Sequence, residues 1–133
     1  VEGGEDMSIW PQSVEETNHE HAKMVKTLIK PGKAIHTTLS TPQLELVHDA
    51  LGIAGEAGEL VDAIKKYVIY NKELDIENVI EELGDLEFYM QDLREKLGIT
   101  REQTLKANMK KLGKRYKNYQ YTDQQAHDRA DKA

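Results

Sequence analysis

Residues 51–66, LGIAGEAGELVDAIKK, decide the fold because they join a helical apolar pattern to a pair of acids. At about 100° per residue, Ile53 and Leu60 lie on one side of a helix, and Glu56 and Glu59 lie beside them. An apolar stripe of this kind is the face that a helix buries against its neighbours. The segment is therefore predicted to be a core helix whose apolar stripe is flanked by acids.

A second stretch, EELGDLEFYMQDL at residues 81–93, repeats this arrangement. Glu82 and Asp85 lie on one side of the predicted helix, next to a stripe that includes Leu86 and Met90. The short connection between the two helices favours antiparallel packing. We therefore expect the two acidic pairs to converge at one edge of the seam between the helices.

The rest of the chain is also helical in pattern, since no segment shows the period-two alternation of a strand. The fold class is predicted to be all-α, a bundle of four to five helices. Residues 30–41, which begin with KPGK, are expected to form a loop. Capping signals and apolar spacing predict four helices. The first begins after Ser13 and runs to about Ile29, and the second has Thr41 as its N-cap and runs to about Tyr70. The third has Asp75 as its N-cap and runs to Leu97, and the fourth runs from Thr100 to about Lys117.

Domain organisation is simple, because the chain has room for one compact core. Residues 1–6 precede the first methionine and are expected to be a cloning remnant. Residues 7–118 are predicted to form one domain. Residues 119–133 are polar, and are expected to be a tail or a short helix docked on a partner subunit.

Composition excludes several classes of function. The chain has 18 Lys and Arg against 24 Asp and Glu, a net charge of -6, which argues against nucleic acid as a partner. The absence of Cys rules out disulfides and thiolate metal sites. No apolar run approaches the roughly 18 residues of a membrane span. A cytoplasmic protein without a membrane partner is the expectation.

The four acids at the seam suggest a metal site, since clustered carboxylates repel one another until cations compensate their charge. Oxygen ligands alone favour a hard ion, Mg²⁺ first and Mn²⁺ second. A di-iron bundle would need Glu-x-x-His on two helices, which this chain lacks. Acid pairs of this spacing also occur on ordinary solvated helices. Three glycines would leave room for a ligand or a neighbouring helix: Gly52, Gly55 and Gly58.

The acids together resemble the signature of the MazG-like group of all-α nucleoside triphosphate pyrophosphohydrolases, which is E-x-x-E, a spacer and E-x-x-D. Here Glu56, Glu59, Glu82 and Asp85 match it. The resemblance extends over residues 44–116, including ANMKKLGKRY near the end. It implies a MazG-like bundle that assembles as a homodimer or homotetramer. Wide apolar stripes on so short a chain point the same way.

The resemblance also implies an activity, the magnesium-dependent hydrolysis of nucleoside triphosphates, with dNTPs favoured, to the monophosphate and pyrophosphate. The four acids would hold the metal, and Glu56 and Glu59 would be the catalytic pair. Tyr89 matches an aromatic residue that packs on the nucleotide sugar. Three residues of the last helix match ones that reach the nucleotide or its phosphates: Asn108, Lys111 and Arg115.

Other functions stay open from the sequence. The same scaffold could be a non-catalytic module that binds nucleotides or cations and oligomerises. The same chemistry could act on another pyrophosphate, such as phosphoribosyl-ATP. The purpose of an enzyme could be house-cleaning of the nucleotide pool or control of a signalling nucleotide. Asp49 could be an outer-shell acid of the metal site, and His48 is expected to be a surface residue or a substrate contact.

Overall fold

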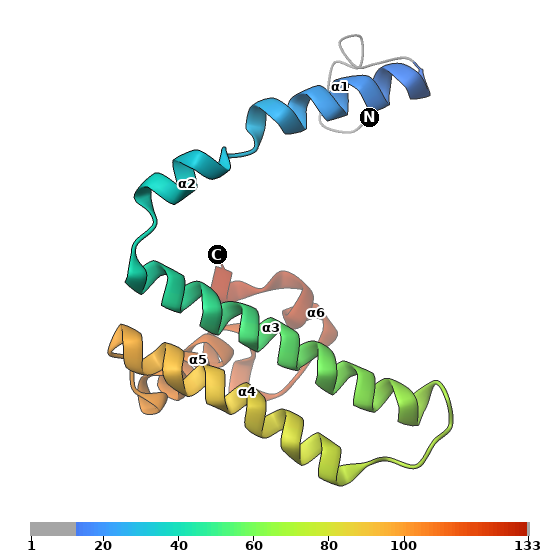
Figure 1. Ribbon diagram of the computed structural model, residues 1–133. Helices are drawn as coiled ribbons and strands as arrows, with labels where there is room; N and C mark the ends of the chain where they lie inside the picture. The colour runs from blue at the N-terminus through green and yellow to red at the C-terminus, as the bar shows by residue number, and fades with distance from the viewer. Residues whose placement is uncertain (1–12, 133) are drawn as a thin grey trace. The chain divides into compact units, whose positions relative to one another are not determined.

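The computed structural model describes residues 13–132, and within that range every regular element is helical (Figure 1). The all-α fold class is therefore confirmed. The suspected cloning remnant at residues 1–6 lies outside the described residues. In chain order the elements are α1 (Val14–Leu28), α2 (Gly32–Thr38), α3 (Thr41–Val68), α4 (Ile76–Leu97), α5 (Arg101–Arg115), η2 (Lys117–Tyr119), α6 (Asp123–Asp128) and η3 (Ala130–Lys132).

Three of the predicted helix starts have the capping contacts that their sequences indicated. The side chains of Ser13, Asp75 and Thr100 each accept a hydrogen bond from a backbone N–H three residues later. Gln103 returns the contact by accepting from the backbone N–H of Thr100, which completes a capping box. Gly98 ends α4 with φ of 66°, a left-handed conformation that favours glycine.

The prediction of a loop over residues 30–41 is wrong, because Gly32–Thr38 forms α2. Pro31 ends α1, but its φ of -60° also suits the start of the next helix. The hydroxyls of Thr37 and Thr38 then donate to carbonyl oxygens one turn back. A proline that stops one helix has thus started another. A further difference is that Thr41 is the first residue of α3 instead of its cap.

The chain divides into two units after Ser40. In the first, the described residues form α1 and α2, and their larger apolar side chains are exposed, Val14 and Leu28 among them. Neither helix has a buried residue. The first unit therefore has no core of its own among residues 13–40.

The second unit is built on a hairpin in which α3 and α4 lie side by side and run in opposite directions (Figure 1). The predicted antiparallel pair is therefore present. Only one apolar side chain is fully buried in the described chain, that of Ala63. The half-buried apolar residues of the seam are Leu46, Ile53 and Leu60 from α3, and Val79, Leu86 and Leu93 from α4.

Two of the four predicted acids, Glu59 and Asp85, are exposed at the edge of this seam, as the sequence indicated, and the other two are partly covered by it. Glu56 and Glu82 are half-buried, and Asp49 is only 2% exposed. Conversely, Met90, which was expected in the core stripe, is exposed, and so is Leu83 on the same helix. The two helices are thus rotated so that they bury part of their polar edge. Much of the apolar surface remains exposed on the hairpin.

The C-terminal segment folds back onto α5 of the same chain, since η2, α6 and η3 all contact that helix. A tail or a short helix on a partner subunit was expected here. The structure shows a short helix, α6, whose first turn is capped by the side chain of Thr122. Its contacts are with α5 of its own chain. No helix within residues 13–132 is both long and apolar enough to cross a bilayer.

Candidate metal centre in the helical hairpin

Three of the predicted metal ligands come together where α3 and α4 face each other. Glu56 on α3 and Glu82 and Asp85 on α4 each offer one carboxylate oxygen, and these oxygens lie within 4.8 Å of one another. The antiparallel hairpin causes this meeting, because it sets the middle of α3 opposite the first half of α4. Glu82 and Asp85, three residues apart on α4, share one face.

Glu82 is the most constrained acid of the three. Its Oε2 atom is buried and has no hydrogen-bond partner among the described residues. Burial raises the pKa of the Glu82 carboxyl, and the neighbouring carboxylates of Glu56, Asp85 and Glu59 raise that pKa further. A buried carboxylate with neither a donor nor a cation is unfavourable. The site therefore favours either a proton or a metal ion on this group.

Glu59, the fourth predicted ligand, is exposed and is not one of the three residues whose oxygens cluster. Its charge still contributes to the raised pKa of Glu82, so it lies near the same acidic edge. An exposed glutamate can change rotamer at little cost. The structure thus brings three of the four predicted acids together and leaves the fourth close by.

The donor set suits a hard divalent cation. Oxygens bound to one Mg²⁺ at about 2.1 Å from the ion are at most about 4.2 Å apart, so small side-chain rotations would bring the three carboxylates into its shell. All donors are carboxylate oxygens, which is the chemistry that Mg²⁺ and Mn²⁺ prefer. The buried, unpartnered Oε2 of Glu82 gives such an ion a ready ligand.

Tyr89 lies one turn beyond Asp85 and packs across the seam onto Gly52 of α3. A Cβ added at Gly52 would lie 2.4 Å from Cδ1 of the Tyr89 ring. His48 and Phe88 both meet the same ring edge-on, at centroid distances of 5.9 Å and 5.1 Å. His48 is therefore a packing neighbour of the residue expected to bind the nucleotide sugar.

The three glycines of α3 do not have the same environment. Gly52 is required for the close approach of Tyr89, which agrees with the expected role of leaving room for a neighbouring helix. Around Gly55 and Gly58, no atom of the described chain lies within 4 Å of an added Cβ, apart from the helix's own nearby backbone. Among these three residues, only Gly52 has a neighbouring side chain in the described structure that is close enough to require a glycine.

A second polar cluster, centred on Lys96, was not recognised from the sequence. The Lys96 ammonium contacts Asp92 one turn back on α4, and it lies 3.7 Å from Asp49 and 3.9 Å from Glu45 on α3. Asp49 was considered as an outer-shell acid of the metal site, but its ion pair is with Lys96. The signal in the sequence was the Asp92–Lys96 spacing of four residues, which is common on solvated helices.

Burial raises the pKa of Asp49, and the adjacent Asp92 raises it further, while Lys96 and His48 act in the opposite direction. The hydrogen bond from Lys96 lowers the pKa of Asp92. The two carboxyl groups thus differ although they are neighbours: Asp49 tends to keep a proton, and Asp92 tends to stay ionised. Oδ2 of Asp49 is buried and has no hydrogen-bond partner in the described chain.

The predicted phosphate-binding residues lie on α5 and differ in their surroundings. Asn108 is exposed and Lys111 is half-buried. Arg115 forms a two-pronged ion pair with Asp131 of η3, with Nε–Oδ1 and Nη2–Oδ2 distances of 2.7 Å and 3.1 Å. Asp131 was not predicted from the sequence, because it lies in a polar stretch without an apolar pattern.

Comparison with known proteins adds one match. A family model described as the MazG nucleotide pyrophosphohydrolase domain matches residues 49–120. No curated protein and no solved structure matches the chain significantly. The matched range contains the three clustered carboxylates, Glu59, Tyr89 and the three predicted contact residues of α5.

Proposed function

The chain belongs to the MazG family of nucleotide pyrophosphohydrolase domains, and from this membership we propose that it hydrolyses nucleoside triphosphates, with dNTPs as the first candidates, to the monophosphate and pyrophosphate. The observation that carries the proposal is the meeting of Glu56, Glu82 and Asp85 within 4.8 Å, with a buried and unpartnered oxygen on Glu82. Such a group is costly to maintain unless a cation compensates it.

A divalent cation, Mg²⁺ or alternatively Mn²⁺, is bound by the acids of the seam: Glu56, Glu59, Glu82 and Asp85. When bound, it neutralises phosphate charge and makes water easier to deprotonate. Glu82 and Asp85 supply ligands from α4. Glu56 and Glu59 face them from α3, and one of these two accepts the proton of the attacking water. The proximity of Glu59 to this edge supports its place in the set.

The nucleotide extends from the acids over neighbouring side chains. Tyr89 packs on the sugar, a role supported by the position of its ring one turn beyond Asp85 and against Gly52. Asn108, Lys111 and Arg115 contact the nucleotide or its phosphates from α5. The positions i, i+3 and i+7 put these three within about 60° of arc on one helix face. Lys111 and Arg115 match the charge of a polyphosphate.

The enzyme assembles as a homodimer or homotetramer. The exposed apolar surface of the hairpin supports this proposal, because Leu51, Val61, Ile80 and Phe88 are 67%, 65%, 62% and 68% exposed. A single buried apolar residue in the described chain is too small a core for an independent monomer. Packing the hairpins of two copies together would form a four-helix bundle and bury these side chains.

Product analysis tests the proposal. The purified protein is incubated with Mg²⁺ and each of the eight common NTPs and dNTPs, together with phosphoribosyl-ATP, and pyrophosphate is measured against orthophosphate. We expect pyrophosphate from at least one nucleotide. We also expect its loss in Glu59→Gln and its retention in Glu81→Gln, which removes an exposed neighbouring acid that is not among the three clustered ligands.

The outcomes separate the alternatives. If pyrophosphate is released from phosphoribosyl-ATP alone, the proposed reaction is supported but the substrate is a different nucleotide. Orthophosphate as the sole product would contradict pyrophosphohydrolysis. Failure with every substrate, combined with nucleotide binding, would favour a non-catalytic nucleotide-binding module on the same scaffold.

A further inference from the structure

The ion pair between Arg115 and Asp131 has the geometry with which arginine binds a phosphate group. Both Asp131 oxygens accept from the same guanidinium, at 2.7 Å and 3.1 Å. The Asp131 side chain is 2% exposed and that of Arg115 is 17% exposed, so the pair is shielded from water. Bidentate pairing of this type is the arrangement that a guanidinium makes with phosphate as well as with carboxylate.

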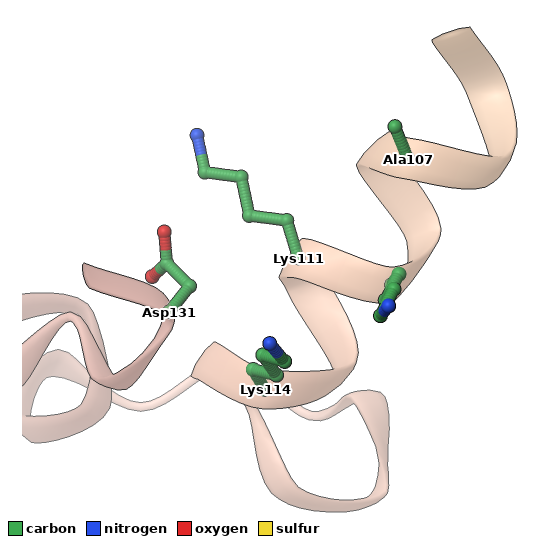
Figure 2. Close-up of a pocket in the computed structure, with 5 residues that line it drawn as sticks. Ala107, Lys111, Lys114 and Asp131 are labelled. Atoms are coloured by element: carbon green, nitrogen blue, oxygen red, sulfur yellow. The ribbon is translucent and has the colours of Figure 1, made fainter. Parts of the chain in front are cut away.

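Three lysines of α5 line a pocket on the side of this pair where Asp131 lies. Lys110, Lys111 and Lys114, with Ala107 and Asp131, line a pocket of about 280 Å³ (Figure 2). Figure 2 shows Lys111 extending from α5 toward the side on which Asp131 lies. Between residues 13 and 132, no carboxylate oxygen lies within 4.0 Å of any of the three ammonium groups. The pocket therefore has an excess of positive charge.

The excess of positive charge in the pocket indicates that its ligand is an anion. Three lysines line the pocket with a single carboxylate, that of Asp131, and Arg115 pairs with the same carboxylate, so the cluster can accept an anion of higher charge than Asp131 carries. A polyphosphate offers several oxygens of negative charge within the span of such a pocket. Asp131 itself is well held in the free chain, since the hydrogen bond from Arg115 lowers the pKa of its carboxyl.

We propose that the C-terminal segment, residues 120–132, is an internal cap in which Asp131 occupies the anion site of Lys110, Lys111, Lys114 and Arg115 until a polyphosphate displaces it. The inference rests on the proposed function in identifying the polyphosphate as that of the nucleotide. It goes beyond that function because it makes access to α5 conditional on release of η3 and α6. The segment is suited to release, since it contacts α5 and little else.

Binding of inorganic pyrophosphate, measured by calorimetry in the presence of EDTA, tests the cap without requiring catalysis. We expect Asp131→Asn to bind pyrophosphate about tenfold more tightly than the wild type, because the competing carboxylate is removed. Asp128→Asn is the matched control. It removes the same charge from the same segment, but Asp128 accepts its hydrogen bond from Gln124 and does not contact Arg115.

Two comparisons decide the result. Equal affinities for Asp131→Asn, Asp128→Asn and the wild type would overturn the proposal and leave Asp131 as a structural anchor. The gain must also disappear when Arg115→Gln is added, because it depends on the freed guanidinium. A gain that persists in the double variant would reflect net charge alone, and would also overturn the proposal.

Hydrogen exchange gives an independent measurement on the unmodified chain. Saturating pyrophosphate should speed exchange of the backbone amides of residues 123–132, while those of α4 stay unchanged. Exchange that is unchanged or slowed in 123–132 would contradict displacement. Neither measurement depends on turnover, so the cap can be tested separately from the enzyme activity. If the protein binds pyrophosphate in this way but hydrolyses no nucleotide, the proposed function is refuted and the proposed cap is supported.

Discussion

The Tyr89 ring lies directly over Gly52, so that a Cβ added at residue 52 would be 2.4 Å from the ring. This contact joins α4 to α3 next to the acidic cluster. The rings of His48 and Phe88 also contact the Tyr89 ring, both in T-shaped arrangements. The glycine thus serves the site indirectly, by letting the aromatic ring and the two helices come close together.

Gly52→Ala should therefore destabilise the protein although alanine favours a helix. The added methyl group must displace the ring or separate α3 from α4, at a cost of about 1–3 kcal/mol. Urea unfolding followed by circular dichroism measures the change. Gly55→Ala is the control on the same helix, because nothing in the described chain lies within 4 Å of its added Cβ. It should gain up to about 1 kcal/mol. Equal effects of the two substitutions would show that the contact does not decide stability.

Glu82→Gln should weaken metal binding strongly. The substitution removes the buried carboxylate that faces Glu56 and Asp85, and an amide oxygen is a poorer ligand for Mg²⁺. We expect a loss of at least about tenfold in Mn²⁺ affinity, measured by calorimetry or by the EPR signal of free Mn²⁺.

The adjacent Glu81 provides the control for metal binding, because it is exposed and lies outside the cluster. Glu81→Gln should bind Mn²⁺ as the wild type does. If the two variants were equally weakened, a diffuse field of negative charge would explain the binding better than a defined site.

Asp49→Asn should change how stability depends on pH. The folded state raises the pKa of Asp49 above its ordinary value of 3.8, so the native protein keeps a proton that the unfolded chain releases. The stabilisation that Asp49 gives the wild-type protein is therefore fully present at pH values below its ordinary pKa. It is lost as the pH rises through the raised pKa of the folded state. Asparagine does not ionise. The melting temperature of the variant, relative to wild type, should rise as the pH increases above about 4.

The pH comparison must consider every charged group that faces Asp49: Glu45, His48, Asp92 and Lys96. Asp92 acts in the opposite sense, because its pKa is lowered, so the difference between variant and wild type is the meaningful quantity. Asp62→Asn is a control, as Asp62 pairs with Lys66 on the exposed surface of α3. A difference curve for Asp49→Asn that is flat with pH, or that matches the one measured for Asp62→Asn, would count against the buried proton.

Phe88→Asp should disrupt self-association. Phe88 is 68% exposed on the hairpin, and burial of such a side chain against another copy would contribute about 2–3 kcal/mol. Light scattering should give a dimer or tetramer for the wild type and a smaller species for the variant. Gln120→Asp, a charge added at an exposed polar position on another segment, should leave the mass unchanged. A wild type that is monomeric at all concentrations would refute the assembly.

Much of the hairpin could be predicted because its determinants are local. The caps at Asp75 and Thr100 and the left-handed Gly98 depend on contacts between residues at most four apart, which a linear pattern records. The α2 helix was missed for the opposite reason. Pro31 indicates a break equally well whether a loop or a new helix follows it, and the sequence does not distinguish the two.

In the candidate site, too, some features follow from local sequence patterns and others do not. Spacing alone placed Glu82 and Asp85 on one face of a helix, and the hairpin then set Glu56 opposite them. Spacing could not predict that the helices would rotate to bury Asp49 and expose Leu83, because rotation depends on how two surfaces fit together.

The sequence by itself determined the four longer helices, their order and the acids that they carry, because capping, propensity and periodicity act over a few residues. Only the tertiary structure decided which of those side chains meet. Lys96 pairs with Asp49 across the hairpin, and Arg115 pairs with Asp131 sixteen residues later. These contacts depend on the path of the chain between the partners and on the loss of water around them, neither of which a local pattern contains.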